Sequence, residues 1–269
     1  MRRVSRRKRR QDFIGWMLIV FSLVAIGGLA YVYYAATFHA IALNPDNMCP
    51  QTGPHSITVV LIDTTDPLDP VQQEDVRKQL EDITDNVPRY GEIELFTVAP
   101  ARDALLSAKL AACNPGRGSD IDPMYGNPAL VEKRWQKAFS DKADEVLGQL
   151  LQSQTLATSP IMESIQQIAV QAFVGQGVEN IPKRLIVVSD MLQNSPGFSQ
   201  YRGIESFKEF RRSPYYIKVR PNLAGVDVTI LYLRRLNASH LQGRRHIEFW
   251  QSYFSDAGAT LVDVKSIEG

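Results

Sequence analysis

An uncharged apolar segment, Phe13 to Ala36, lies near the N-terminus of this 269-residue chain. A run of this length without a charge is typical of a membrane helix rather than of a soluble core. As a helix these residues would reach about 36 Å, enough to cross a bilayer with some tilt. Trp16 near one end and Tyr31 and Tyr34 near the other stand where amphipathic rings favour the membrane interface. We therefore predict a transmembrane helix over residues 13–36, with the lipid bilayer as its partner.

A cleaved signal peptide is the competing interpretation, because Ala40-Ile41-Ala42 has the small-x-small form of a cleavage site. The apolar part of a signal peptide is about 7 to 15 residues long, and the segment here is far longer. A retained anchor is therefore favoured.

Seven Lys and Arg residues lie within the first ten positions, and none occurs between Gln11 and Val76. This asymmetry predicts a cytoplasmic tail over 1–12, a single pass through the inner membrane, and a C-terminal part in the periplasm or outside the cell.

The charge and composition of the remaining chain limit which functions its folded part can have. The residues after Arg10 carry 23 basic against 29 acidic side chains, a formal charge of −6, which disfavours nucleic-acid binding by the folded part. A hydrophobic content of 44% supports a packed core. If the folded part lies outside the cytosol, Cys49 and Cys113 become a candidate disulfide, with two buried thiols as the alternative.

Apolar runs and helical periodicities alternate after a turn-rich segment, residues 37–55, which we interpret as a stalk. Residues 56–269 are predicted to form one domain, with an irregular insertion at 101–127. Its expected strands are Ser56–Asp63, Glu92–Ala99, Leu185–Ser189, Val226–Leu233 and Ala259–Val264, and its expected helices cover about 72–87, 128–152, 160–173 and 240–257. Such alternation predicts an α/β fold with a doubly wound, mainly parallel sheet and helices on both faces.

Acidic turns follow two of the apolar strands. The first is Leu61 to Pro67 and the second is Val187 to Leu192. Ligands of doubly wound sheets bind at the carboxyl ends of the strands, so Asp63, Thr65 and Asp190 are candidate site residues. Carboxylate and hydroxyl oxygens of this kind are ligands for a hard cation such as Mg²⁺. The alternative is that both aspartates accept backbone N–H bonds within their turns.

At these residues the chain resembles the von Willebrand factor A family, whose metal-ion-dependent adhesion site combines Asp-x-Ser-x-Ser after the first strand, a later Thr and an Asp after the fourth strand. Asp63 and Asp190 are similar to the first and last Asp of this site, Thr65 takes the place of the first Ser, and Thr158 is the nearest match for the loop Thr, with Thr155 left open. Pro67 stands where the second Ser is expected, so one ligand is missing. The resemblance covers roughly residues 55–264 and implies a protein-interaction module, with or without metal.

A phosphoryl-transfer enzyme similar to haloacid dehalogenases is the second functional hypothesis. Asp63 would be its nucleophile and Thr65 would occupy the general-acid position. The usual acid is absent at that position, and no Asp-Asp pair follows a later strand to hold Mg²⁺. A non-enzymatic function is therefore favoured.

The segment from Phe198 to Asn222 mixes aromatic and basic residues, the types that dominate protein interfaces. It directly follows the second acidic turn. The candidate partner-binding residues are Arg202, Phe207, Arg211, Arg212 and Tyr215. An amphipathic helix with its aromatics on the sheet is the alternative. The sequence thus predicts a membrane-anchored module that binds a protein partner, whose identity it does not give, at the strand ends.

Overall fold

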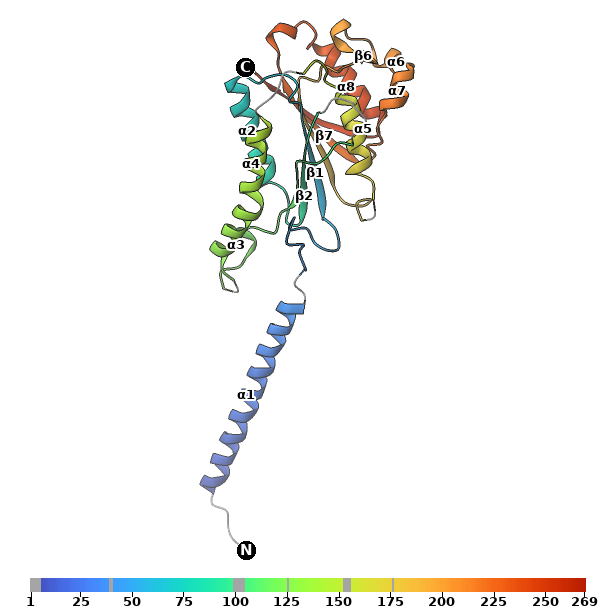
Figure 1. Ribbon diagram of the computed structural model, residues 1–269. Coiled ribbons are helices and arrows are strands. Elements are labelled where there is room, and N and C mark those ends of the chain that lie inside the picture. The colour runs from blue at the N-terminus through green and yellow to red at the C-terminus, as the bar shows by residue number, and fades with distance from the viewer. Residues whose placement is uncertain (1–5, 39–40, 99–104, 125, 152–155, 176) are drawn as a thin grey trace. The chain divides into compact units, whose positions relative to one another are not determined.

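The computed structural model describes residues 6–38, 41–98, 105–124, 126–151, 156–175 and 177–269 (Figure 1). The chain separates into two compact units, Met1–Ala42 and Leu43–Gly269. The first contains the helix α1, Arg6–Phe38. Within it, Phe13–Tyr34 is long and apolar enough to span a membrane, with a mean hydropathy of 2.3. The segment predicted as a stalk, residues 37–55, is divided between the two units.

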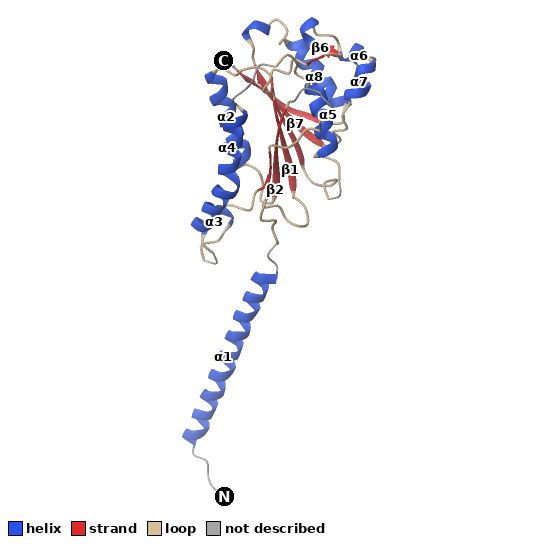
Figure 2. Cartoon of the chain, viewed as in Figure 1, coloured by secondary structure: helices blue, strands red, loops and turns tan. Residues whose placement is uncertain are grey.

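The second unit is built on a six-stranded sheet with the order β3-β2-β1-β4-β7-β8 (Figure 2). Neighbouring strands are parallel except β2 and β3, which are antiparallel. The strands are β1 Ser56–Ile62, β2 Gly91–Thr97, β3 Leu110–Cys113, β4 Lys183–Ser189, β7 Val226–Leu233 and β8 Thr260–Ile267. A small ribbon of β5, Asn194–Ser195, and β6, Phe198–Ser199, is separate. The predicted α/β fold with a mainly parallel sheet is confirmed.

Strand β1 is buried on both faces, which is why its sequence is a continuous apolar run rather than an alternating one. Val59 and Leu61 pack into one core cluster, whereas Val60 and Ile62 pack into another on the opposite face of the sheet. At about 25 cal/mol per Å² of buried apolar surface, each such side chain contributes roughly 1.5 to 3 kcal/mol relative to exposure. The central strands therefore anchor both layers.

Helices cover both faces of the sheet, one group on each side (Figures 1 and 2). One face carries α2 Pro70–Asp85, α3 Pro128–Trp135 and α4 Asp141–Leu150, with the π-helical turn η2, Gln136–Ser140, between the last two. The other face carries α5 Ile161–Gln171, α6 Phe207–Phe210, α7 Pro214–Val219 and α8 Arg244–Asp256. Three short 3₁₀ turns are η1 Gly118–Asp120, η3 Gln200–Arg202 and η4 Leu236–Ala238.

Strand β3 was not predicted, because its four residues, Leu110 to Cys113, lie inside the stretch interpreted as an irregular insertion. It pairs with β2 at one edge of the sheet. Cys113, its last residue, forms a disulfide with Cys49, as predicted. The backbone N–H of Cys113 also donates to Asn47 O at 2.8 Å. The segment after Leu43 is thus fastened to the sheet rather than free of it.

Candidate functional site

The direction of the chain through the sheet creates a crevice between β1 and β4. From β1 the chain moves to β2 on one side, and from β4 it moves to β7 and β8 on the other. Such a reversal of strand order is where doubly wound sheets bind ligands, outside the carboxyl ends of the strands. Ile62 pairs with Val188 in register, and Asp63 and Asp190 follow these two residues closely. Both predicted aspartates therefore lie at this edge, and both are buried.

Asp63 is held by four hydrogen bonds, two to each carboxylate oxygen. Oδ1 accepts from the backbone N–H of Thr65 at 3.1 Å and from the Thr65 hydroxyl at 2.6 Å. Oδ2 accepts from the hydroxyls of Ser159 at 2.9 Å and Ser189 at 2.7 Å. Because the side chain is only 5% exposed, these donors replace the water that an ionised carboxylate needs. Three separate stretches of chain meet at this one side chain.

The structure places the loop hydroxyl at Ser159 rather than at the predicted Thr158. Thr158 is half-buried and, within the described part of the chain, does not hydrogen-bond to Asp63, whereas its neighbour Ser159 is buried and donates to it. Backbone hydrogen bonds in both directions between Ser159 and Asn194, at 2.8 and 2.9 Å, hold the loop against the ribbon after β4. Thr155 lies outside the described residues. A serine directly before a proline predicts a helix N-cap at Ser159, but this prediction is wrong, since Pro160 occupies the N-cap of the next helix.

Asp190 is 3% exposed and is paired with an arginine that the sequence reasoning did not select. Its Oδ1 accepts from the backbone N–H of Leu192 at 2.9 Å, and its Oδ2 lies 3.2 Å from Nε of Arg235. Burial, and then the negative charge of Asp63, raises the pKa of Asp190 to about 7. Arg235 opposes this rise. The site therefore holds two buried carboxyl groups close enough to influence each other.

The donor set does not fit the divalent cation that the resemblance implied. Both oxygens of Asp63 are already hydrogen-bonded, Pro67 offers no hydroxyl, and Asp190 is ion-paired with Arg235. Among the described residues, the one group of three His, Cys, Asp or Glu ligands within bonding reach of a common ion is Cys49, Glu92 and Cys113. Two of those three form the disulfide.

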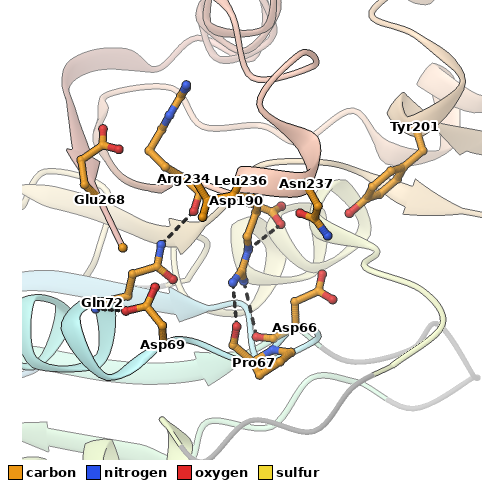
Figure 3. A pocket seen from close by; sticks show the side chains of 12 residues that line it. Asp66, Pro67, Asp69, Gln72, Asp190, Tyr201, Arg234, Leu236, Asn237 and Glu268 are labelled. Atoms are coloured by element: carbon orange, nitrogen blue, oxygen red, sulfur yellow. Dashed lines mark hydrogen bonds and ion pairs between the residues drawn. The ribbon is translucent and has the colours of Figure 1, made fainter.

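A cleft of about 380 Å³ opens beside Asp190 (Figure 3). Polar and charged side chains from the loops after β1, β4 and β7 form most of its wall. The residues around it are Asp66, Pro67, Asp69, Gln72, Asp190, Tyr201, Arg234, Arg235, Leu236, Asn237, Glu268 and Gly269. Leu236 is 91% exposed and Tyr201 is 48% exposed, so an aliphatic and an aromatic side chain are exposed among the polar residues of the lining.

Helix α8 holds the backbone that follows Asp190. Met191 has φ of +59°, a left-handed conformation that is strained for a residue with a side chain. Its carbonyl accepts a hydrogen bond from Trp250 Nε1 at 2.9 Å and lies 3.1 Å from His246 Nε2. His246 Nδ1 is 2.6 Å from the hydroxyl of Tyr232. Burial lowers the pKa of His246 to about 4, so this imidazole is neutral in the folded protein at neutral pH.

Replacing His246 with glutamine is expected to change how stability responds to acid. The unfolded histidine titrates near pH 6.5 and the folded one near 4, so this group's stabilising contribution is complete above pH 6.5 and disappears as the pH falls to 4. Relative to the variant, the parent should lose up to about 1.4 kcal/mol per pH unit across that window. Urea unfolding at several pH values measures this, and Asp190, present in both proteins, cancels in the difference. Parallel pH profiles would contradict the prediction.

The five predicted partner-binding residues divide into two groups. Arg202, Arg211 and Arg212 are exposed, and Arg211 pairs with Asp256 at 2.9 Å. Phe207 is half-buried and packs in tilted and edge-to-face contacts against aromatic residues of α6, α7 and α8. The Tyr215 hydroxyl donates to Glu163 at 2.6 Å and is within hydrogen-bond distance of Ser195 and Gln193. The aromatic members thus face the interior, as in an amphipathic helix, and the arginines face solvent.

Comparisons with known proteins give structural neighbours only. No protein-family model and no curated protein matches the chain. Solved structures similar to it include the conserved hypothetical protein BatB from Bacteroides thetaiotaomicron, with 12% identity, a TM-score of 0.39, and coverage of 80% of this chain and 91% of that one. The SpRpn10 VWA domain has 14% identity, a TM-score of 0.39, and coverage of 79% and 88%. An aerotolerance-related membrane protein from Bacteroides fragilis has 10% identity, a TM-score of 0.36, and coverage of 79% and 91%.

Three features of the second unit match the expectation drawn from the sequence resemblance. The sheet is mainly parallel with one antiparallel edge strand, helices cover both faces, and acidic residues follow the adjacent strands β1 and β4. The folded part of this chain, Leu43–Gly269, has a von Willebrand factor A-like fold.

Proposed function

We propose that the chain is a single-pass membrane-anchored protein-interaction module that binds a protein partner at its strand-end face. Its folded part would lie in the periplasm or outside the cell. The apolar segment Phe13–Tyr34 and the seven basic residues before it support the anchor and its orientation. The disulfide between Cys49 and Cys113 supports an oxidising compartment, because disulfides rarely persist in the cytosol.

The rim of the cleft is the observation that carries this proposal. Three residues lie beside the polar interior of the cleft (Figure 3). They are Leu236 and Asn237 from the loop after β7, and Tyr201 from the segment between β4 and β7. Leu236 is 91% exposed. A partner that covers this side chain would remove its apolar surface from water, which favours binding. An exposed apolar residue and an aromatic residue around fixed polar groups are typical of a protein-binding surface.

The chain enters the folded unit at the other end of the sheet. The backbone N–H of His55, just before β1, donates to Tyr90 O, just before β2. Asn47 contacts Cys113, which pairs with Glu92 near the start of β2. The segment after Leu43 thus packs at the amino ends of β1 and β2. The described residues of this segment therefore lie at the opposite end of the strands from Asp63 and Asp190, which supports a partner site at the strand-end face.

The exposed arginines Arg202, Arg211 and Arg212 form a second part of the proposed contact. They follow the strand-end loop in sequence and present positive charge on the surface. Complementary charge of this kind raises association rates and selects partners more than it raises affinity. We propose that they favour an acidic surface on the same partner.

Mg²⁺ is not part of this proposal, because the donor set does not fit it. The phosphoryl-transfer alternative also lacks support from the site. The Asp63 carboxylate is 5% exposed, and hydroxyl donors occupy both of its oxygens. A nucleophile needs an accessible lone pair. Exposure of the protein to beryllofluoride is therefore expected to leave Asp63 unmodified.

A photo-crosslinking amino acid placed at Asn237 in the full chain is expected to capture a discrete partner in native membranes. The matched control is the same amino acid at Val262, which is 60% exposed on the edge strand β8, away from the cleft. Adding Leu236→Asp to the Asn237 probe should reduce the crosslinked product by about tenfold or more, as expected for loss of an interface hot spot. Equal capture from both probe positions, or a product unchanged by Leu236→Asp, would argue against a strand-end interface.

A further inference from the structure

Arg235 is seated by buried contacts rather than lying freely at the surface. It follows β7, and its backbone N–H donates to Gln242 Oε1 at 2.7 Å. Gln242 is 1% exposed, and its Nε2 donates to Leu233 O at 2.7 Å and to Asp190 O at 3.2 Å. One buried amide thus fixes the loop after β7 against the loop after β4. The arginine side chain is only 14% exposed.

The guanidinium of Arg235 joins the three loops at the carboxyl ends of β1, β4 and β7. Nε pairs with Asp190 Oδ2 at 3.2 Å. Nη1 donates to Pro67 O at 2.7 Å and Nη2 to Asp66 O at 3.4 Å. All three of these contacts are to oxygen atoms, one of them a carboxylate. Oxygen atoms from separate loops converging on one positive charge are also the arrangement by which a hard cation is held.

We infer that Arg235 is the built-in cation of this site and that its guanidinium takes the place of a divalent ion. At position 67 the guanidinium contacts the backbone carbonyl, an acceptor for an N–H donor, and the proline side chain has no hydroxyl to offer a metal ion. A guanidinium stays charged at all accessible pH values and offers five N–H donors in a plane. It joins the loops permanently, so their cohesion does not depend on the metal content of the surroundings.

The same contacts keep divalent ions out. A second cation at Asp190 would meet a fixed positive charge at ion-pair distance from the same carboxylate. Removing the guanidinium while keeping both aspartates is therefore expected to create affinity for a divalent ion. Removing a positive charge that lies elsewhere in the cleft is not expected to create such affinity. This inference concerns the site itself and holds whether or not the proposed partner binding is correct.

Mn²⁺ titration of the full chain in detergent, followed by electron paramagnetic resonance of the free ion, tests the inference. The parent should bind Mn²⁺ only weakly, whereas Arg235→Ala should bind one Mn²⁺ at least about tenfold more tightly than the parent does. Arg234→Ala is the matched control, because Arg234 lines the same cleft and makes no ion pair with Asp190 in the described structure. Adding Asp190→Asn to Arg235→Ala should abolish the gain.

Either of two results would overturn the inference. One is a stoichiometric Mn²⁺ site in the parent that Asp190→Asn weakens. The other is a folded Arg235→Ala protein, as judged by near-ultraviolet circular dichroism, that gains no more Mn²⁺ affinity than Arg234→Ala. If Arg235→Ala does not fold, Arg235→Gln repeats the test with a polar side chain that has no charge, and the result for the parent remains decisive.

Discussion

Replacing Asp63 with alanine is expected to lower the free energy of unfolding by about 3 to 5 kcal/mol, because it removes a buried charged acceptor and leaves its donors behind. The hydroxyls of Thr65, Ser159 and Ser189 would each lose the acceptor of a short hydrogen bond. Thr65 and Ser189 are 2% and 0% exposed, so water cannot readily replace the carboxylate there. The loops after β1 and β4 and the one before α5 would lose their common partner.

Urea unfolding of the full chain measures this change, and Asp66→Ala is the matched control. Asp66 is the same residue type three positions later, is half-buried, and contributes only its backbone oxygen to the contacts described above. Its replacement should cost less than about 1 kcal/mol. Asp63→Asn should fall between the two, since the amide keeps the shape but has one oxygen instead of two. A cost for Asp63→Ala no greater than that for Asp66→Ala would mean that the hydroxyl cluster does not stabilise the fold.

The central strands could be predicted because burial on both faces forces a continuous apolar run. The predicted runs Ser56–Asp63, Leu185–Ser189 and Val226–Leu233 correspond to β1, β4 and β7. Strand β3 escaped prediction because it has four residues, Leu110 to Cys113, and pairs only at the sheet edge. Edge pairing is a backbone interaction that leaves little pattern in so short a sequence.

The two aspartates of the site could be predicted from the sequence, but most of their hydrogen-bond partners could not. Asp63 and Asp190 end apolar runs, and parallel neighbouring strands must bring such ends to one edge. Ser189 immediately precedes Asp190 at the end of β4, yet it was not among the predicted site residues. A serine directly before a proline is typical of a helix N-cap, and this local pattern predicts that role for Ser159. Local sequence cannot show that its hydroxyl instead donates to a side chain 96 positions earlier.

Arg235 carries no sequence signal of its own role. Two arginines, Arg234 and Arg235, follow β7, and a pair of charges at a strand end normally reads as a solvated turn. Which of them turns inward depends on the alternation of the strand and on Gln242, which fixes the backbone of Arg235 from a turn seven residues later. The choice between an internal cation and an external one is therefore made by tertiary contacts.

Loss of the disulfide is expected to have a comparably large effect on stability. Cys49 and Cys113 are separated by 64 positions, and in the chain-entropy model closing a loop of that size stabilises the folded state by about 4 kcal/mol. The bond ties the segment that enters the folded unit to the edge strand β3. Replacing both cysteines with alanine should therefore lower the melting temperature by roughly 8 to 15 °C for a domain of this size.

A reducing agent provides the internal control for this prediction. Dithiothreitol should lower the melting temperature of the parent toward that of the double variant, and it should leave the double variant unchanged. In intact cells, neither cysteine should react with a membrane-permeant thiol reagent before reduction, because the bond forms only where the folded part meets an oxidising environment. Alkylation of both thiols in untreated cells would contradict the disulfide and the exported location together. Protected thiols with no change in melting temperature would keep the location and show that the rest of the sheet alone holds the entering segment.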